Sequence, residues 1–203
     1  MVISIWRHWL LSILLVLSVQ LHSQINLVIN PGFEEYEYFE TELKTLPFKA
    51  TLDWKSFRTP DLYLRQGLDE YENVVRIAPY LNECIIGSLK YPTQKNTIYL
   101  FSVDVFSFKT RRDKNLLQIC LFENYDENIV VPEQFTNCMD IPTNKIKKGW
   151  QTLKLEFSAP EGMNEILIGN INPLEEKFRL YLDNVKLVAP VETPVGTILL
   201  GNE

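Results

Sequence analysis

The stretch WQTLKLEFSA, residues 150–159, alternates apolar and polar side chains over most of its length. Successive side chains of a β-strand point to opposite faces, so this alternation predicts a strand with one face in a hydrophobic core. One face carries the apolar residues Leu153, Leu155 and Phe157, and the other carries the polar residues Thr152, Lys154 and Glu156. A chain built from such stretches is expected to form sheets rather than helices.

Six further stretches have strand character: 73–79, 83–91, 97–108, 115–123, 165–171 and 178–188. The charged turn KTRRDK separates 97–108 from 115–123, and this arrangement predicts a β-hairpin. The best helical candidate, residues 62–74, would form one or two turns at most. Many short strands with Pro-, Asn- and Gly-containing connections predict an all-β sandwich or barrel.

Residues 1–23 have the composition of a secretory signal peptide. Arg7 supplies a positive charge, residues 9–17 an apolar run, and residues 21–23 a cleavage site. The apolar run falls short of the roughly 20 residues of a membrane-spanning helix. We expect an exported domain at 24–189 with no integral membrane span after cleavage, followed by a C-terminal tail or linker at 190–203. The alternative is an uncleaved N-terminal anchor.

The net charge of −6 argues against binding of nucleic acid or of anionic membrane surfaces, because phosphate binding relies on clustered Lys and Arg. The basic clusters at 109–114 and 145–148 are predicted to be solvated turns. Both histidines, His8 and His22, lie in the signal segment. A mature chain without histidine excludes Ser-His-Asp and Cys-His catalysis and His-ligated zinc.

Walker A and GxGxxG motifs are absent from the sequence, so nothing indicates a glycine-rich phosphate-binding loop. Acid–base chemistry on two carboxylates stays open in principle, because a glycosidase needs only a pair of Asp or Glu. Catalysis is therefore disfavoured, and a non-enzyme is expected.

The three cysteines, Cys84, Cys120 and Cys138, share no CxxC spacing. In an exported protein an odd count suggests one disulfide and one remaining thiol. Cys120 lies in an apolar strand-like run and Cys138 beyond a polar loop, which favours that pair. The alternative is three buried thiols that pack as small hydrophobic side chains.

Four motifs occur in an order known from one fold family: NLVINPGFEEY at 26–36, DWKSFRTPDLY at 53–63, KKGWQTLKLEFSA at 147–159 and LYLDNVKLV at 180–188. In this the chain resembles the galactose-binding-like jelly roll of family 4/9-type carbohydrate-binding modules. It resembles more closely a version in exported surface proteins of Gram-negative bacteria, which often precedes an outer-membrane-protein-A-type peptidoglycan-binding domain. The resemblance implies an all-β jelly-roll β-sandwich over about 26–188.

The resemblance also implies a structural calcium ion. The first and last strands of such a jelly roll are neighbours, and Glu34 and Asp183 are then the candidate ligands. Carboxylate and carbonyl oxygens are what calcium requires. The family's common Asp-Asp pair is Asp183-Asn184 here, which removes one charge. The alternative is that Glu34 accepts backbone hydrogen bonds and Asp183 caps a strand end.

Sugar binding calls for aromatic platforms beside amide and carboxylate groups. The candidate ligand-binding residues are Tyr36, Tyr38, Trp54, Tyr63 and Tyr80. Trp54 and Trp150 lie within the recurrent motifs, so packing is the expected role of each. The Tyr-rich stretch 34–42 is the candidate recognition loop; alternatively it is a solvated loop.

Three classes of function follow. The first is a non-catalytic extracytoplasmic carbohydrate-binding module that binds a polysaccharide or cell-wall glycan, with the protein in the periplasm, on the outer-membrane surface or outside the cell. The second is a structural or adhesive domain of the cell envelope without a small ligand. The third, less favoured, is a hydrolase on a jelly-roll scaffold.

Overall fold

The computed structural model describes residues 25–35, 45–47, 51–57, 60–64, 73–112, 116–124, 137–142, 145–171 and 177–189. The predicted signal peptide, the tail at 190–203, and Tyr36 and Tyr38 lie outside these residues. Within the part of the chain that the structure describes, no helix is long and apolar enough to cross a bilayer.

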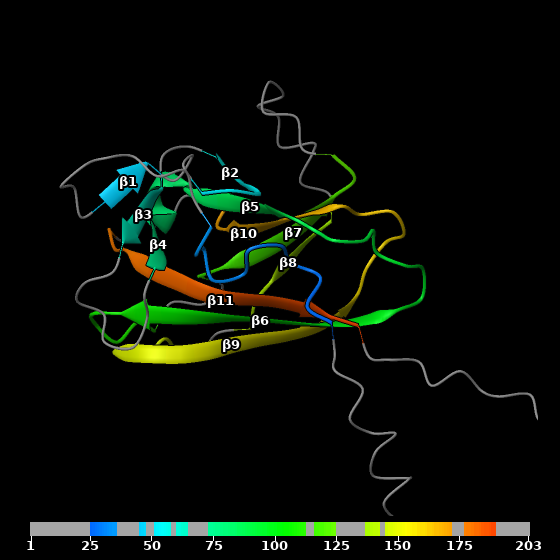
Figure 1. Ribbon diagram of the computed structural model, residues 1–203. Helices are drawn as coiled ribbons and strands as arrows, with labels where there is room; N and C mark the ends of the chain where they lie inside the picture. The colour runs from blue at the N-terminus through cyan, green and yellow to red at the C-terminus, as the bar shows by residue number, and fades with distance from the viewer. Residues whose placement is uncertain are drawn as a thin grey trace, which may run out of the picture.

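Two antiparallel sheets pack face to face (Figure 1). The six-stranded sheet has the order β1 (Thr45–Pro47), β3 (Asp61–Leu64), β4 (Asn73–Ile77), β11 (Leu180–Val188), β6 (Ile98–Ser107) and β9 (Gly149–Ser158). The five-stranded sheet has the order β2 (Trp54–Phe57), β5 (Cys84–Ser88), β10 (Glu165–Gly169), β7 (Gln118–Phe122) and β8 (Cys138–Asp140). A short 3₁₀ turn, η2 (Pro79–Leu81), follows β4. The all-β sandwich prediction is confirmed.

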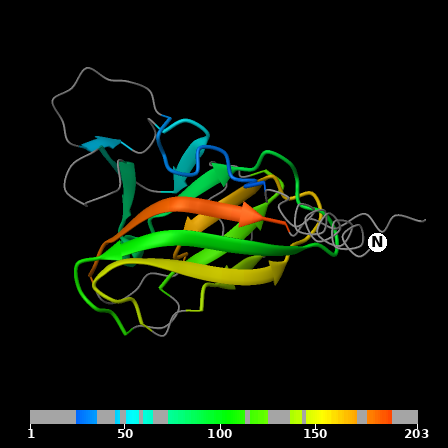
Figure 2. The ribbon, with the colours of Figure 1, turned by 60° about the horizontal axis from the view of Figure 1, so that its bottom comes forward.

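The long strands β6, β11 and β9 lie side by side, as Figure 2 shows in green, orange and yellow. Along β6, Tyr99, Phe101, Val103 and Val105 are buried, and the side chains between them are exposed or half-buried. In β9, Leu153, Leu155 and Phe157 pack with the core, while their neighbours face outward as predicted. The period-2 pattern therefore fixes which face of each strand meets the opposite sheet.

The predicted hairpin between 97–108 and 115–123 is wrong. Both strands form, but β6 pairs with β11 and β9, whereas β7 pairs with β10 and β8 in the other sheet. The chain crosses from one sheet to the other between them, and the apolar faces of β6 and β7 both belong to the core cluster between the sheets. The weak helix prediction at 62–74 is also wrong at both ends, where β3 and β4 form.

The N-terminal segment 25–35 joins the two sheets. Asn26 bridges Val188 at the end of β11, and Val28 bridges Leu89 just after β5. The Asn26 side chain reinforces the first contact, since its Nδ2 donates to Val185 O at 3.0 Å. The predicted adjacency of the first segment and the last strand is therefore observed, although the segment makes isolated bridges rather than a full strand.

Asn30 fixes the turn that follows this segment. Its side chain accepts from the Glu35 N–H at 3.0 Å and donates to Glu35 O at 2.7 Å and to Leu52 O at 3.1 Å. Its carbonyl accepts from Trp54 Nε1 at 2.9 Å. Asn30 has a φ of 46°, a conformation that Asn tolerates better than most residues. The Asn-Pro-Gly sequence thus forms a turn that these buried and part-buried hydrogen bonds hold in place.

Cys120 and Cys138 form a disulfide between β7 and β8, the pair favoured from the sequence. Cys84 does not take part in it; its buried thiol donates to Asn82 O at 3.7 Å. The disulfide ties the edge strand β8, only three residues long, to the rest of its sheet.

Candidate functional site

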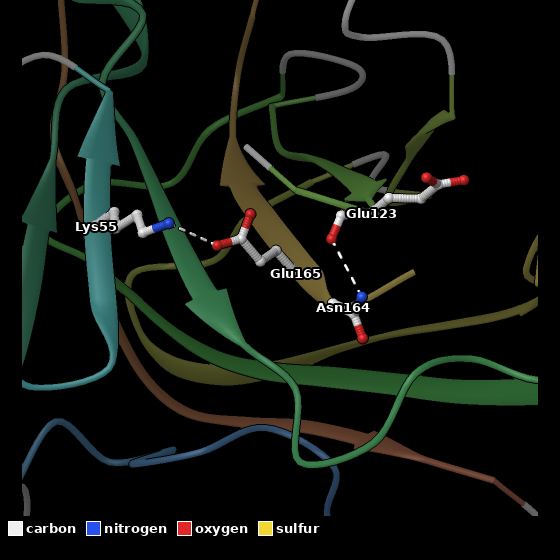
Figure 3. Close-up of polar contacts among 4 residues, drawn as sticks. All are labelled: Lys55, Glu123, Asn164 and Glu165. Carbon is white, nitrogen blue, oxygen red and sulfur yellow. Dashed lines mark hydrogen bonds and ion pairs between the residues drawn. The ribbon is translucent and has the colours of Figure 1, made fainter. Parts of the chain in front are cut away.

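The outer faces of the two sheets differ in how much of their side-chain surface is exposed. On the five-stranded sheet, the outward positions Ile86, Cys120 and Leu167 form a second apolar cluster and are at most 1% exposed. Beside this cluster Lys55 of β2 reaches across to Glu165 of β10 and forms an ion pair at 2.8 Å (Figure 3). Nearby, Asn164 Nδ2 donates to the Glu123 carbonyl. This face is covered, so it offers no open platform.

The six-stranded sheet carries an aromatic row on its outer face. Tyr181 of β11 is paired with Phe106 of β6, and Phe106 is paired with Trp150 of β9. Residues paired across antiparallel strands lie on the same face, so the three rings stand next to one another on neighbouring strands. Centroid distances are 6.0 Å from Phe106 to Tyr181 and 5.4 Å from Phe106 to Trp150.

A fourth ring, that of Phe108, extends this row beyond the end of β6. Its centroid lies 4.9 Å from that of Phe106 and 5.6 Å from that of Tyr181, with nearly perpendicular planes in both pairs. Phe108 is 57% exposed, whereas Tyr181 is 8% exposed and supports it from beneath. Phe106 and Trp150 are half-buried. We call Phe106, Phe108, Trp150 and Tyr181 the aromatic platform; edge-to-face contacts of this kind hold rings in fixed orientations.

A pocket of about 380 Å³ opens beside the aromatic platform, where β6 ends and β11 begins. Its volume lies near the lower end of the roughly 300–1,000 Å³ typical of small-molecule sites. The lining residues are Tyr80, Ser107, Phe108, Lys109, Arg111, Lys177, Phe178, Arg179 and Tyr181. Three segments far apart in the sequence thus meet at one end of the sheet.

Local contacts fix the walls of this pocket. The Ser107 hydroxyl donates to Lys109 O at 2.7 Å and accepts from Lys109 N, which shapes the bend after β6. The backbone of Arg111 pairs with that of Ile146 through two hydrogen bonds. The Arg111 guanidinium lies 4.8 Å from the centroid of the Phe178 ring, an orienting cation–π contact.

The five predicted ligand-binding residues are spread over different surroundings. Tyr80 lines the pocket. Tyr63 lies in β3 opposite Val74, and its side chain is outside the described part of the structure. The prediction that Trp54 is a ligand platform is wrong. Its side chain is 4% exposed, packs on Phe33 and donates its indole N–H to the Asn30 carbonyl. A ring buried on both faces offers none to a sugar, and Trp54 is therefore a framework residue.

The sequence-based assignment missed most of the aromatic platform. Phe106 and Phe108 both fall within the predicted strand 97–108, which is rich in apolar residues, and there an aromatic side chain suggests core packing. Trp150 was expected to pack because it lies in a recurrent motif, but it faces outward. The usable signal was parity, because Phe106 and Phe108 alternate with the core positions of their strand.

The predicted pair Glu34 and Asp183 is brought together around Gly32. A Cβ atom placed on Gly32 would lie 3.6 Å from Asp183 Oδ1 and 3.9 Å from Glu34 Oε1. Glu34 Oε2 accepts from Asn73 Nδ2 at 2.6 Å, and Asp183 Oδ1 accepts from the Asn184 N–H at 2.6 Å. Asn184 also donates from Nδ2 to Asp104 Oδ2 at 3.1 Å. Three acidic side chains therefore lie near one another at this junction.

Burial of Asp183 raises its pKa from the ordinary value of 3.8 to about 7. The cost of removing a charged carboxylate from water is the largest cause, and the charges of Glu34 and Asp104 act in the same direction. The Asn184 hydrogen bond opposes them by favouring the ionised form. A cation placed among these oxygens would relieve the same repulsion.

The donor set suits calcium in kind, because it offers carboxylate oxygens and no sulfur or imidazole. Among the described residues, however, no cluster of three or more His, Cys, Asp or Glu side chains is arranged to hold a metal ion. A calcium ion at this junction would thus need backbone carbonyl oxygens or water to complete its coordination.

Comparison with known proteins shows the fold. No protein-family model and no curated protein sequence matches the chain. Among solved structures, the arabinose-bound MgGH51 α-L-arabinofuranosidase is similar at a TM-score of 0.51 and 11% identity, over 81% of this chain and 26% of that enzyme. The chain therefore spans about a quarter of the length of that enzyme.

Two shorter structures are similar over most of their own length. One is the CBM22-1 xylan-binding domain of Xyn10C from Paenibacillus barcinonensis, with a TM-score of 0.49 and 14% identity over 82% of this chain and 97% of that domain. The other is the C-terminal CBM6 of the marine laminarinase LamC from Zobellia galactanivorans, with a TM-score of 0.43 and 9% identity over 82% of this chain and 99% of that module. The two antiparallel sheets, together with the similarity to the arabinofuranosidase, make the chain an all-β jelly-roll β-sandwich.

Proposed function

We propose that the protein is a non-catalytic carbohydrate-binding module that binds a polysaccharide on the aromatic platform. The observation that carries the proposal is the contiguous row of rings on the outer face of the six-stranded sheet, in which Phe108 is exposed and Phe106 and Trp150 are half-buried. A pocket lined by aromatic and cationic side chains lies at its end. The similar fold within an arabinose-bound arabinofuranosidase is consistent with a carbohydrate ligand.

The chemistry of the platform suits a sugar chain. The C–H faces of a pyranose pack on aromatic rings, and its hydroxyl groups bond to polar side chains at the rim. Phe106 and Trp150 lie on adjacent strands about 5 Å apart, and Phe108 extends the surface toward the pocket. An open row of rings fits an extended polymer better than an isolated monosaccharide.

Affinity electrophoresis in gels that contain xylan, laminarin, mixed-linkage glucan or peptidoglycan-derived glycan tests the proposal. We expect retardation by at least one polysaccharide, and its loss in the double variant Phe108→Ala, Trp150→Ala. Tyr91→Ala is the matched control, because Tyr91 is 62% exposed and does not belong to the platform. Retardation that survives the double variant, or that Tyr91→Ala abolishes equally, would contradict the assignment of the platform.

Export is part of the same proposal. The Cys120–Cys138 disulfide supports it, because disulfides persist in oxidising compartments and are rare in the cytosol. The protein would then act in the periplasm, on the outer-membrane surface or outside the cell. Fractionation of cells that express the full chain tests this, and a reduced protein retained in the cytosol would contradict it.

The alternative is a structural or adhesive cell-envelope domain without a small ligand. Absence of binding to any glycan, together with co-sedimentation with peptidoglycan or outer membrane, would favour it over the module.

We further propose a structural calcium ion held by Glu34 and Asp183. The proposal is supported by the two carboxylates that flank Gly32. It is also supported by the charge of Glu34, which adds to burial, the main cause, in raising the pKa of Asp183. Calcium should raise the melting temperature of chelator-treated protein, and Asp183→Asn should remove that response. A wild-type melting temperature unchanged by calcium would reject the site.

A further inference from the structure

The pocket beside the aromatic platform concentrates positive charge in an acidic protein. Four of its lining side chains are cations, Lys109, Arg111, Lys177 and Arg179, and none of the described residues that line it is Asp or Glu. The whole chain carries a net charge of −6, so this local excess of positive charge opposes the overall composition. Such a concave cationic surface attracts anions.

The side chains are directed to one place by the strand pattern. Lys177 and Arg179 are exposed, and Phe178 between them is buried in the core. The same alternation continues into β11, where Leu180 is buried in the core and Tyr181 faces the platform. Lys177, Arg179 and Tyr181 therefore share the outward side of one extended segment.

The two arginines and two lysines offer complementary contacts. Arg111 is oriented by the Phe178 ring at 4.8 Å, and a guanidinium so held can bind a carboxylate or sulfate through two parallel hydrogen bonds. Lys109 and Lys177 are exposed point charges. Within the described residues, no carboxylate forms an ion pair with Lys109, Lys177 or Arg179.

The pocket and the platform share Phe108 and Tyr181. A sugar ring stacked on Phe108 would therefore place a substituent at the mouth of the pocket. We infer that this pocket binds the anionic group, carboxylate or sulfate, of an acidic polysaccharide whose neighbouring sugar rings lie on the aromatic platform. The inference rests on the proposed function and names the class of its ligand.

Affinity electrophoresis with matched polymers tests the inference. Polygalacturonate and its methyl ester differ in the carboxylate charge, and dextran sulfate and dextran differ in the sulfate. We expect stronger retardation by the charged member of at least one pair, and which pair responds identifies the group. The double variant Lys177→Glu, Arg179→Glu should weaken that binding by about tenfold or more, because it replaces attraction by repulsion.

The control is the double variant Lys154→Glu, Lys186→Glu. Both lysines are exposed and lie on the outer face of the same sheet, in register with Ser102 and away from the pocket. It applies the same change in net charge to the same face. Circular dichroism and melting temperatures establish that both double variants fold.

The outcomes separate this inference from the proposed function. Preference for a charged polymer that is lost in the pocket variant and kept in the control supports the inference. An equal loss in both variants would overturn it in favour of general surface attraction. Binding of neutral polymers alone would overturn it and leave the module intact. No binding to any polysaccharide would overturn both.

Discussion

The ring of Trp150 lies 5.4 Å from the ring of Phe106, centroid to centroid, across the pairing of β9 with β6. Neither ring belongs to the core cluster between the sheets. Contiguous aromatic side chains on an outer face are typical of binding surfaces, so this pair is where the proposed platform is tested first.

Trp150→Ala should weaken polysaccharide binding by about tenfold or more, since a stacked aromatic ring commonly contributes at least 1–2 kcal/mol to binding. The melting temperature should fall little, because Trp150 is only half-buried. Isothermal titration calorimetry with the polysaccharide found by electrophoresis measures the change. Trp150→Phe should retain part of the affinity. If Trp150→Phe bound the polysaccharide as weakly as Trp150→Ala, the result would argue against stacking.

Gly87 and Trp54 show why one glycine in β5 is required. The two residues are paired between β5 and β2, and a Cβ on Gly87 would lie 2.8 Å from two atoms of the indole ring. Gly87→Ala should therefore destabilise the fold by about 1–3 kcal/mol through overpacking. Denaturant unfolding measures the change, with Ser88→Ala in the same strand as the control.

A double-mutant cycle tests the cause of that loss. In a Trp54→Leu background the obstructing ring is gone, so Gly87→Ala should cost much less there than in the wild type. Equal costs in the two backgrounds would show that the ring is not the reason for the glycine.

The sequence predicted those parts of the fold that depend on local pattern. In β9 the alternation of Leu153 with Lys154 places each side chain on its face, because strand periodicity is a property of neighbouring residues. Pairing is not local, and the hairpin proposed across 109–114 was wrong because β6 and β7 find partners far along the chain.

The same difference between local pattern and non-local contact decides which site residues could be predicted. Glu34 and Asp183 were paired by resemblance, and they do lie together. The pocket brings Tyr80, Lys109 and Arg179 together from three distant segments. Tyr80 was chosen for its ring alone, whereas Lys109 was assigned to a solvated turn. Only the folded arrangement shows that these cations converge.

The Cys120–Cys138 disulfide closes a loop with a sequence separation of 18 residues. In the chain-entropy description, a loop of this length stabilises the fold by about 3 kcal/mol. The double variant Cys120→Ala, Cys138→Ala should lose stability of that order in denaturant unfolding.

A reductant supplies the control for this prediction. It should destabilise the wild type and leave the double variant unchanged, since Cys84 is not part of the disulfide. Peptide mapping of the non-reduced protein checks the pairing directly. Recovery of Cys84 in a disulfide with either partner would contradict the observed connectivity.

Asp183 makes stability depend on pH in the direction opposite to that of a carboxylate whose pKa is lowered on folding. It is 4% exposed, and its pKa is about 7 in the folded protein against 3.8 for the ordinary group. Between these values the folded state holds a proton that the unfolded chain has released. The free energy of unfolding of metal-free protein should therefore fall as pH rises from about 4 to 7, by up to about 1.4 kcal/mol per pH unit.

Denaturant unfolding in the presence of a chelator, from pH 4 to pH 8, measures this slope for the wild type and for Asp183→Asn. The asparagine cannot ionise, so the variant should lack the pH dependence that Asp183 contributes. The difference between the two proteins removes the effect of the carboxylates that do not interact with Asp183 and leaves that of Asp183 and its neighbours Glu34 and Asp104. Calcium bound at Glu34 and Asp183 would favour the ionised carboxylate, so its addition should flatten or reverse the slope in the wild type only. If the wild type and Asp183→Asn had the same slope in chelator, Asp183 would have to be ionised in the folded protein well below pH 7.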